Sequence, residues 1–128
     1  MNAIAEQIVE LPAPGGPPSP ATLDRVFSAL ADPVRRGMLA RLSHGPASVS
    51  ELARPLPISL PAVLQHLKSL EASGLVASEK NGRVRTVRLE RKALTAAEGW
   101  LASRRQEWET RLDRFETHLH EVQQENDQ

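Results

Sequence analysis

The dipeptide Asn81-Gly82 is the feature that most constrains how this chain folds. It separates residues 75–80 from residues 83–89, and apolar and basic side chains alternate along the second segment. Asn-Gly between such segments is the strongest short-range indication of a β-hairpin, because both turn positions favour positive φ. The other patterned segments have helical periodicity, so we predict a mainly α-helical protein with a small β-hairpin wing.

Four helices are predicted ahead of this hairpin, because prolines and glycines interrupt the apolar periodicity there. The first begins near Thr22. Asp32-Pro33 ends it and starts the second helix, since proline is tolerated at a first helical position. Ser50 opens a short third helix, and Ser59 caps a fourth. Two short helices so close in sequence predict a helix-turn-helix.

A long amphipathic helix follows the hairpin. Thr95 and Glu98 form a capping box at its start, and Arg105 is the one polar interruption of its apolar heptad positions. About 27 residues of helix extend for ~40 Å, which is longer than a small domain can cover, so we expect a partner chain to cover the remainder. The heptad a and d residues are Leu101, Trp108, Leu112, Phe115, Leu119 and Val122.

Length and composition indicate one domain with tails. A chain of 128 residues, 40% of them hydrophobic, can bury one core and is too short for two ordinary domains. We predict a disordered proline-rich tail over residues 1–20, a winged helix-turn-helix domain over 21–123 that includes a dimerisation helix over 95–123, and a polar tail over 124–128.

The absence of certain residue types excludes several classes of site. The chain has no cysteine, which excludes thiol catalysis, disulfides and thiolate metal sites. We find no apolar run long enough to cross a membrane and no signal peptide, so we expect a cytoplasmic protein without membrane contact.

Charge is distributed unevenly along the chain, although the net charge is zero. Residues 21–92 carry a net charge of +6, and residues 93–128 carry −4. A basic middle with an acidic C-terminal segment indicates that one region meets a polyanion while the other has a different task.

Three motifs in order resemble the bacterial ArsR-type winged-helix repressors. They are Ala-Leu-Ala-Asp-Pro-Val-Arg-Arg over residues 29–36, Val-Ser-Glu-Leu-Ala over 49–53, and the segment over 59–76 that contains Gln-His-Leu-Lys. The resemblance covers roughly residues 22–122.

This resemblance implies a transcriptional regulator that binds double-stranded DNA sequence-specifically and acts as an autoregulatory repressor. It implies a homodimer built from the first and last helices, with two recognition helices in successive major grooves of a palindromic operator. Twofold symmetry places the half-sites about one helical turn, ~10 bp, apart. The expected dimer-interface residues are Leu23, Phe27, Leu101, Trp108, Leu112, Phe115 and Leu119.

The fourth helix is the predicted recognition helix. Its apolar stripe includes Val63 and Leu67, which leaves the opposite side for DNA. Gln65 can pair with adenine, whereas Leu64 and Pro61 can read only DNA shape or a thymine methyl group. Leu64 is alternatively a core residue. The expected DNA contacts on this helix are Ser59, Leu60, Pro61, Leu64, Gln65, His66 and Lys68.

Several polar residues near this helix have two interpretations. Ser59 is primarily a helix cap, although its hydroxyl can also reach a phosphate. His66 borders the core stripe, where packing with one hydrogen bond is the alternative to base contact. Arg35 and Arg36 either meet DNA or form salt bridges with Asp32 or Asp24.

The wing carries three basic residues beside its turn, Lys80, Arg83 and Arg85. We expect Val84 and Thr86 to face one side of the second strand and both arginines the other, so that the arginines point away from the core. Contact with phosphates or the minor groove is then predicted, with an ordinary solvated hairpin as the alternative.

No cofactor and no metal site are predicted. His118 and His120 lie about 200° apart on a helix and cannot share an ion. His118 and Glu121 match half of a zinc motif, but Arg105 and Glu107 occupy the stretch where its second half is expected.

Other functions stay open at this point. A small apolar molecule that enters near Trp100, Trp108 and Phe115 would make the protein a ligand-responsive repressor, and without one it would respond only to its own concentration. A coiled-coil interaction module without DNA binding is a further alternative. An enzyme is not predicted, because no phosphate loop, HExxH motif or Ser/His/Asp elbow is present.

Overall fold

The structure is a computed structural model that describes residues 19–127. The chain divides into two compact units, one up to Ala97 and one from Glu98 onward. Of the tail predicted over residues 1–20, residues 1–18 lie outside the described residues, and Ser19 and Pro20 belong to the start of the first helix. None of the helices within 19–127 combines the length and hydropathy needed to cross a membrane.

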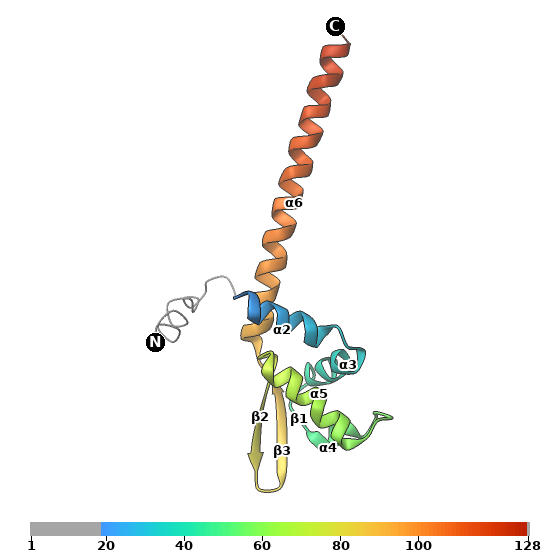
Figure 1. Cartoon of the computed structure of the whole chain (residues 1–128), viewed down its shortest axis with the longest axis vertical. Helices are drawn as coiled ribbons and strands as arrows, with labels where there is room; N and C mark the ends of the chain where they lie inside the picture. Colours follow the sequence, from blue (N-terminus) through green and yellow to red (C-terminus); the bar gives the residue numbers. More distant parts are fainter. Residues whose placement is uncertain (1–18, 128) are drawn as a thin grey trace, which may run out of the picture. The chain divides into compact units, whose positions relative to one another are not determined.

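The first unit is mainly helical, with one small antiparallel sheet (Figure 1). The sheet order is β1-β3-β2, and Ala47 of β1 pairs with Val87 of β3. The predicted fold class is confirmed, although the two-residue strand β1 was not predicted. The elements are α2 (Pro20–Leu30), α3 (Pro33–Leu42), β1 (Ala47–Ser48), α4 (Val49–Ala53), α5 (Leu60–Ala72), β2 (Val76–Asn81), β3 (Val84–Leu89) and α6 (Arg91–Asn126), whose first turns belong to this unit.

Helix α5 contributes most to the core. Its Val63, Leu67 and Leu70 have no measurable exposure. Val87 of β3 is equally buried, and Val26 of α2 is 1% exposed. Burial of a Leu or Val side chain stabilises the fold by roughly 1.5–3 kcal/mol. Helix α5 is therefore fixed by the core, and its opposite side is presented in one orientation.

A glycine turn ends α5 and leads directly into the wing. The N–H of Gly74 donates to Glu71 O at 3.0 Å and that of Leu75 to Leu70 O at 3.2 Å, the two hydrogen bonds of a Schellman motif. Gly74 has a φ of +80°, and a Cβ added there would lie 3.4 Å from Cβ of Ala93 on α6. The turn thus needs glycine for its backbone conformation and for the close approach of α6.

Three helices begin earlier than predicted. Ser19 caps α2, so the helix starts at Pro20 and not near Thr22. Ser48, not Ser50, caps α4, because its extended backbone aims the hydroxyl at the N–H of Glu51. Helix α6 starts at Arg91 rather than at the predicted capping box, since its first turn is held by buried packing of Ala93 and Ala97.

The C-terminal end of α6 also differs from the prediction. The helix continues to Asn126 and so includes residues that were expected in a polar tail from 124. Its last turns contain Gln and Glu, which have good helix propensity and need no buried face.

The hairpin turn is displaced by one residue from the prediction. Asn81 pairs with Val84 as the last pair of the ladder, so the loop is Gly82-Arg83 rather than Asn81-Gly82. Gly82 has a φ of +62°, and no non-glycine residue in the described part of the chain has positive φ. A glycine at the first loop position alone is typical of a type II′ turn. The displacement places Arg83 at the tip of the wing.

Candidate nucleic-acid interface

The side of α5 that faces away from the core exposes two leucines. Leu60 is 54% exposed and Leu64 is 40% exposed, whereas Val63 between them is fully buried. The alternative that Leu64 is a core residue is therefore wrong. Gln65 and Lys68 lie on the same exposed side and are solvent-accessible.

Helix α5 begins at a serine cap. Ser59 accepts a hydrogen bond from the N–H of Ala62 at 3.3 Å, and Pro61 sits in the first turn, where no intrahelical donor is needed. The capping role predicted for Ser59 is confirmed. Its hydroxyl is exposed, as is Pro61, at the end of the helix that a DNA backbone would approach.

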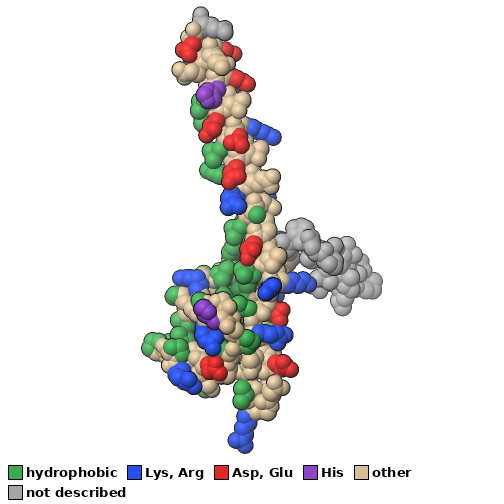
Figure 2. All heavy atoms as spheres, turned by 180° about the vertical axis from the view of Figure 1, so that it is seen from behind, with side chains coloured by type: hydrophobic (Ala, Val, Ile, Leu, Met, Phe, Trp, Pro, Cys, Tyr) green, Lys and Arg blue, Asp and Glu red, His purple; other side chains and the backbone are tan. Residues whose placement is uncertain are grey.

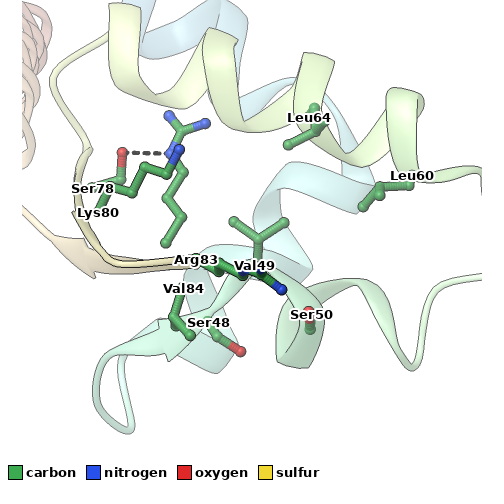
Figure 3. Close-up of a pocket in the computed structure, with 10 residues that line it drawn as sticks. Ser48, Val49, Ser50, Leu60, Leu64, Ser78, Lys80, Arg83 and Val84 are labelled. Atoms are coloured by element: carbon green, nitrogen blue, oxygen red, sulfur yellow. Dashed lines mark hydrogen bonds between the residues drawn. The ribbon is translucent and has the colours of Figure 1, made fainter.

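A groove lined by apolar, basic and serine side chains lies between α5, the start of α4 and the wing (Figure 3). Leu60 and Leu64 of α5 and Val49 at the start of α4 line it, and their side chains point toward the space between the two helices. We call it the α5–wing groove. Its lining residues are Ser48, Val49, Ser50, Leu60, Leu64, Ser78, Lys80, Arg83, Val84 and Arg85.

Two of the basic residues that line this groove are exposed on the wing. Lys80 lies near the end of β2, and Arg83 lies in the turn. Within residues 19–127, neither side chain forms a hydrogen bond or ion pair with another side chain. Both cations are therefore available to an external anion.

Arg85, by contrast, is part of the protein's own framework. Its guanidinium forms an ion pair with Glu71 of α5, and its Nε donates to Ser78 Oγ at 2.9 Å. Ser78 in turn donates to Glu71 Oε1 at 2.6 Å. The expectation that Arg85 points away from the core was wrong, because Arg85 shares its face of β3 with the buried Val87.

The same alternation corrects the position of Val84. Val84 is 53% exposed and Val87 is buried, so the core-facing side of β3 carries the odd-numbered residues and not Val84 and Thr86. Val84 contributes instead to the α5–wing groove.

His66 is bound within the protein, which confirms the packing interpretation. Its Nδ1 lies 3.2 Å from Nη1 of Arg35 and 3.9 Å from Oδ1 of Asp32. The side chain is mostly buried, at 21% exposure. His66 therefore joins α5 to the start of α3 and does not share the exposed side of Leu64.

Arg35 and Arg36 close the C-terminal end of α2. Arg35 donates to the carbonyls of Ala29 and Ser28, each at 2.9 Å, and Arg36 donates to that of Leu30 at 2.8 Å. The carbonyl of Ser28 also accepts the N–H of the C-cap residue Ala31 at 3.2 Å, and cations are favoured near the carbonyls at a helix C-terminus. Arg35 and Arg36 therefore bind backbone carbonyls at the end of α2 and do not form the predicted salt bridges with aspartates.

Asp32 caps α3 through its carboxylate. Its Oδ1 accepts the N–H groups of Val34 at 2.8 Å and Arg35 at 3.1 Å. The hydrogen bond from the Arg35 N–H is the largest effect and holds the pKa of Asp32 below its ordinary value of 3.8. Burial opposes it, and smaller contributions from the Val34 N–H, His66 and the Arg35 charge lower the pKa further.

The second unit consists of α6 from Glu98 onward, and an apolar stripe runs along it. Figure 2 shows hydrophobic side chains exposed along this helix. Trp108 is 63% exposed and Phe115 is 58% exposed. The predicted heptad residues Leu101, Trp108, Leu112, Phe115, Leu119 and Val122 are all exposed within the single chain.

Leu23 and Phe27 of α2 were also expected at a dimer interface. Leu23 is partly buried and packs against the core, and Phe27 has intermediate exposure. Within residues 19–127, no three His, Cys, Asp or Glu side chains are grouped closely enough to hold a metal ion.

Five groove residues were missed by the sequence analysis as candidate site residues: Ser48, Val49, Ser50, Ser78 and Val84. Helix α4 was recognised as the first helix of the helix-turn-helix, but its first turn was not assigned a contact. The serine-rich start of that helix is the feature that pointed to it, because N-terminal hydroxyls and N–H groups favour phosphate.

Comparison with known proteins relates this arrangement to transcriptional regulators. A family model described as a helix-turn-helix domain matches residues 30–79, from the end of α2 into β2. The HTH-type transcriptional regulator Rv2034 of Mycobacterium tuberculosis is 45% identical over 94 residues, which cover 73% of this chain and 78% of that protein.

Two further proteins extend the comparison. The HTH-type transcriptional repressor SmtB of M. tuberculosis is 38% identical over 82 residues, which cover 62% of this chain and 61% of the repressor. The crystal structure of the ArsR family transcriptional regulator RHA00566 is 48% identical and superposes with a TM-score of 0.70, covering 73% of this chain and 96% of that one.

Proposed function

The chain belongs to the ArsR family of winged helix-turn-helix transcriptional regulators, and on that premise we propose that it acts as a homodimeric repressor that grips duplex DNA in the α5–wing groove. The observation that carries this proposal is the groove itself. Exposed Leu60 and Leu64 lie beside Lys80 and Arg83, two cations without side-chain partners in the described chain.

The chemistry of the groove matches the parts of a DNA duplex. Lys80 and Arg83 suit phosphates, which supply a large, salt-sensitive share of affinity. Gln65 suits a base edge, and the leucines suit thymine methyl groups, because they cannot accept or donate hydrogen bonds. Ser59 and the serines at the start of α4 supply further phosphate donors.

The stripe on α6 supports self-association. A soluble chain rarely exposes so many large apolar side chains in one continuous line. Heptad spacing is typical of helices that pair with other helices. A twofold dimer presents two α5 helices, so its operator would be an inverted repeat with half-site centres ~10 bp apart.

Repression is the simplest consequence of binding at a promoter. The similarity to the repressor SmtB supports repression rather than activation. Binding to the DNA upstream of its own gene would make the repression autoregulatory. An apolar effector would bind beside Trp100 and Trp108, which are exposed on α6 in the single chain.

Selection of bound duplexes from a random pool tests the proposal. We expect enrichment of an inverted repeat, and light scattering of the purified complex should show two chains per duplex. A pool that stays random would contradict DNA recognition and favour the interaction-module alternative. Enrichment with one chain per duplex would contradict the dimer alone.

A further inference from the structure

We propose that Glu71 is a positioning residue for DNA binding. Together with Ser78 and Arg85 it ties the wing to α5 and so holds the cations of the wing at a fixed distance from the exposed side of that helix. The inference rests on the proposed DNA-binding function and adds to it the residue that fixes the wing. We call Glu71, Ser78 and Arg85 the wing tie.

The far end of the wing has little support from the sheet. Strand β1 pairs with β3 no further than Thr86, so beyond this residue the hairpin consists of two strands within residues 19–127. A two-stranded hairpin alone is marginally stable in water. Lys80 and Arg83, the two cations proposed to meet phosphates, both lie in this two-stranded end. The sheet alone therefore does not fix their position.

The wing tie spans the level at which the third strand is lost. Each member contacts the other two: Ser78 Oγ donates to Glu71 Oε1 at 2.6 Å, Arg85 Nε donates to Ser78 Oγ at 2.9 Å, and the Arg85 guanidinium forms an ion pair with Glu71. The dashed line at Ser78 in Figure 3 marks the second of these bonds. Arg85 is paired across the ladder with Lys80. Holding Arg85 therefore also holds the backbone that carries Lys80 and leads into the turn.

Glu71 is well placed to be the fixed end of the tie. It lies in the last turn of α5, and its own carbonyl accepts the N–H of Gly74 at 3.0 Å. It follows Leu64 by seven residues, which places both on one side of the helix. The Glu71 side chain is 29% exposed, so its ion pair is partly shielded from water and salt. The wing is thus held against the same side of α5 that exposes Leu64.

The tie also decides which cations of the wing are available to DNA. Glu71 neutralises Arg85, whereas Lys80 and Arg83 have no side-chain partner in the part of the chain that the structure describes. With the tie broken, the two-stranded end can move relative to α5. Arg83 would then have to be ordered when DNA binds, and this ordering lowers affinity.

Variants of Glu71 test the proposal in the full-length protein, because removing Arg85 would also remove a positive charge from the wing. Glu71→Ala and Glu71→Gln remove the same negative charge, but only glutamine keeps an oxygen that can accept from Ser78 and Arg85. The two variants are therefore matched in charge and differ in the tie. Anisotropy titrations would compare both with the wild type on an operator selected from the random pool.

A double-mutant cycle with Arg83→Ala gives a readout that a purely structural role of Glu71 would not change. We expect Glu71→Ala to weaken operator binding about tenfold and Glu71→Gln to stay within about threefold of the wild type. Arg83→Ala should weaken binding about fivefold in the wild type, but less than about twofold in the Glu71→Ala background. Additive losses in the cycle would overturn the proposal. Glu71→Gln as weak as Glu71→Ala would assign the effect to the lost charge and overturn it as well.

Hydrogen exchange in the free protein separates this proposal from the DNA-binding function on which it rests. We expect the amides of residues 80–85 to exchange faster in Glu71→Ala than in the wild type or Glu71→Gln, with unchanged exchange in α5. Equal exchange at the wing in all three proteins would overturn the tie. A wild type that binds the operator and a scrambled duplex equally would refute the proposed function, and the exchange rates would then decide whether Glu71 holds the wing.

Discussion

The arginines of the wing have different tasks although they lie two residues apart. Arg83 is exposed at the turn, and Arg85 is bound to Glu71 and Ser78. The two arginines differ because side chains alternate between the two faces of β3. Arg85 lies on the same face as Val87, which packs into the core.

The two arginines should therefore respond differently to alanine. We expect Arg83→Ala to weaken binding on every duplex and to reduce the salt slope by about one, with an unchanged unfolding temperature. Arg85→Ala should lower the free energy of unfolding by on the order of 1 kcal/mol, since its ion pair is partly solvent-screened. Anisotropy titrations over a salt series and thermal unfolding measure the two effects. If Arg85→Ala instead lost the salt dependence of DNA affinity while its unfolding free energy stayed normal, Arg85 would be a DNA contact and this assignment of the two arginines would be contradicted.

Leu64 should contribute through contact with thymine methyl groups. Deoxyuridine lacks only that methyl, so replacing contacted thymines in a selected operator should weaken wild-type binding roughly fourfold for each methyl lost. Leu64→Ala should bind both duplexes alike. Deoxyuridine placed outside the half-sites is the control, and equal losses in protein and variant would show that Leu64 does not read the methyl.

Asp32 should make stability dependent on pH. Its pKa is depressed in the folded state by the Arg35 N–H, so the stability it contributes is present above about pH 4 and is lost as the pH falls through the folded pKa. Asp32→Asn retains a capping oxygen and removes the titration. Denaturant unfolding should show that the advantage of the wild type over this variant shrinks from about pH 5 to about pH 2. A constant difference across that range would contradict the assignment.

Among the elements, the helices and the hairpin were predictable because their determinants are local. The apolar period of α5 and the glycine turn after it follow from residues close in sequence. The register of the wing turn could not be predicted from nearby residues. The pairing of Asn81 with Val84 depends on which face of β3 meets the core.

The remaining differences arise from packing between distant segments. Helix α6 begins at Arg91 because Ala93 packs against the Gly74 turn, a contact that no local capping pattern reveals. The network of His66 with Arg35 likewise joins residues 31 positions apart. The exposed side of α5 was predicted well, because burial of its opposite side fixes it.

The turn after α5 should tolerate no side chain. Gly74→Ala forces an L residue to a φ of +80° and moves its Cβ toward Ala93, so we expect a loss of about 1–2 kcal/mol. Gly37→Ala is the matched control, because it lies inside α3 with nothing within 4 Å of the added Cβ. It should stabilise the protein by about 0.5–1 kcal/mol. Chemical denaturation measures both; equal effects would show that the turn conformation is not limiting.

For the whole molecule, dimerisation and DNA binding should be coupled. A dimer holds two α5–wing grooves on one duplex, so loss of the α6 seam should weaken operator binding without altering the groove. Phe115→Glu places a charge in the seam, far in sequence from α5. We expect it to yield monomers that bind the operator at least tenfold more weakly, with unchanged unfolding of the first unit. Thr117→Glu, on the outward side, is the control, and a monomeric variant with normal affinity would refute the coupling.

The central claim, that this regulator recognises specific duplex DNA through a basic and apolar groove, is tested most directly by fluorescence anisotropy. The wild type would be titrated with the DNA upstream of its own gene and with a scrambled duplex, at about 50 mM and about 200 mM salt. The account predicts tighter binding to the upstream DNA at both concentrations, with affinity falling steeply as salt rises. Equal affinity for the two duplexes, or no binding to either, would contradict it.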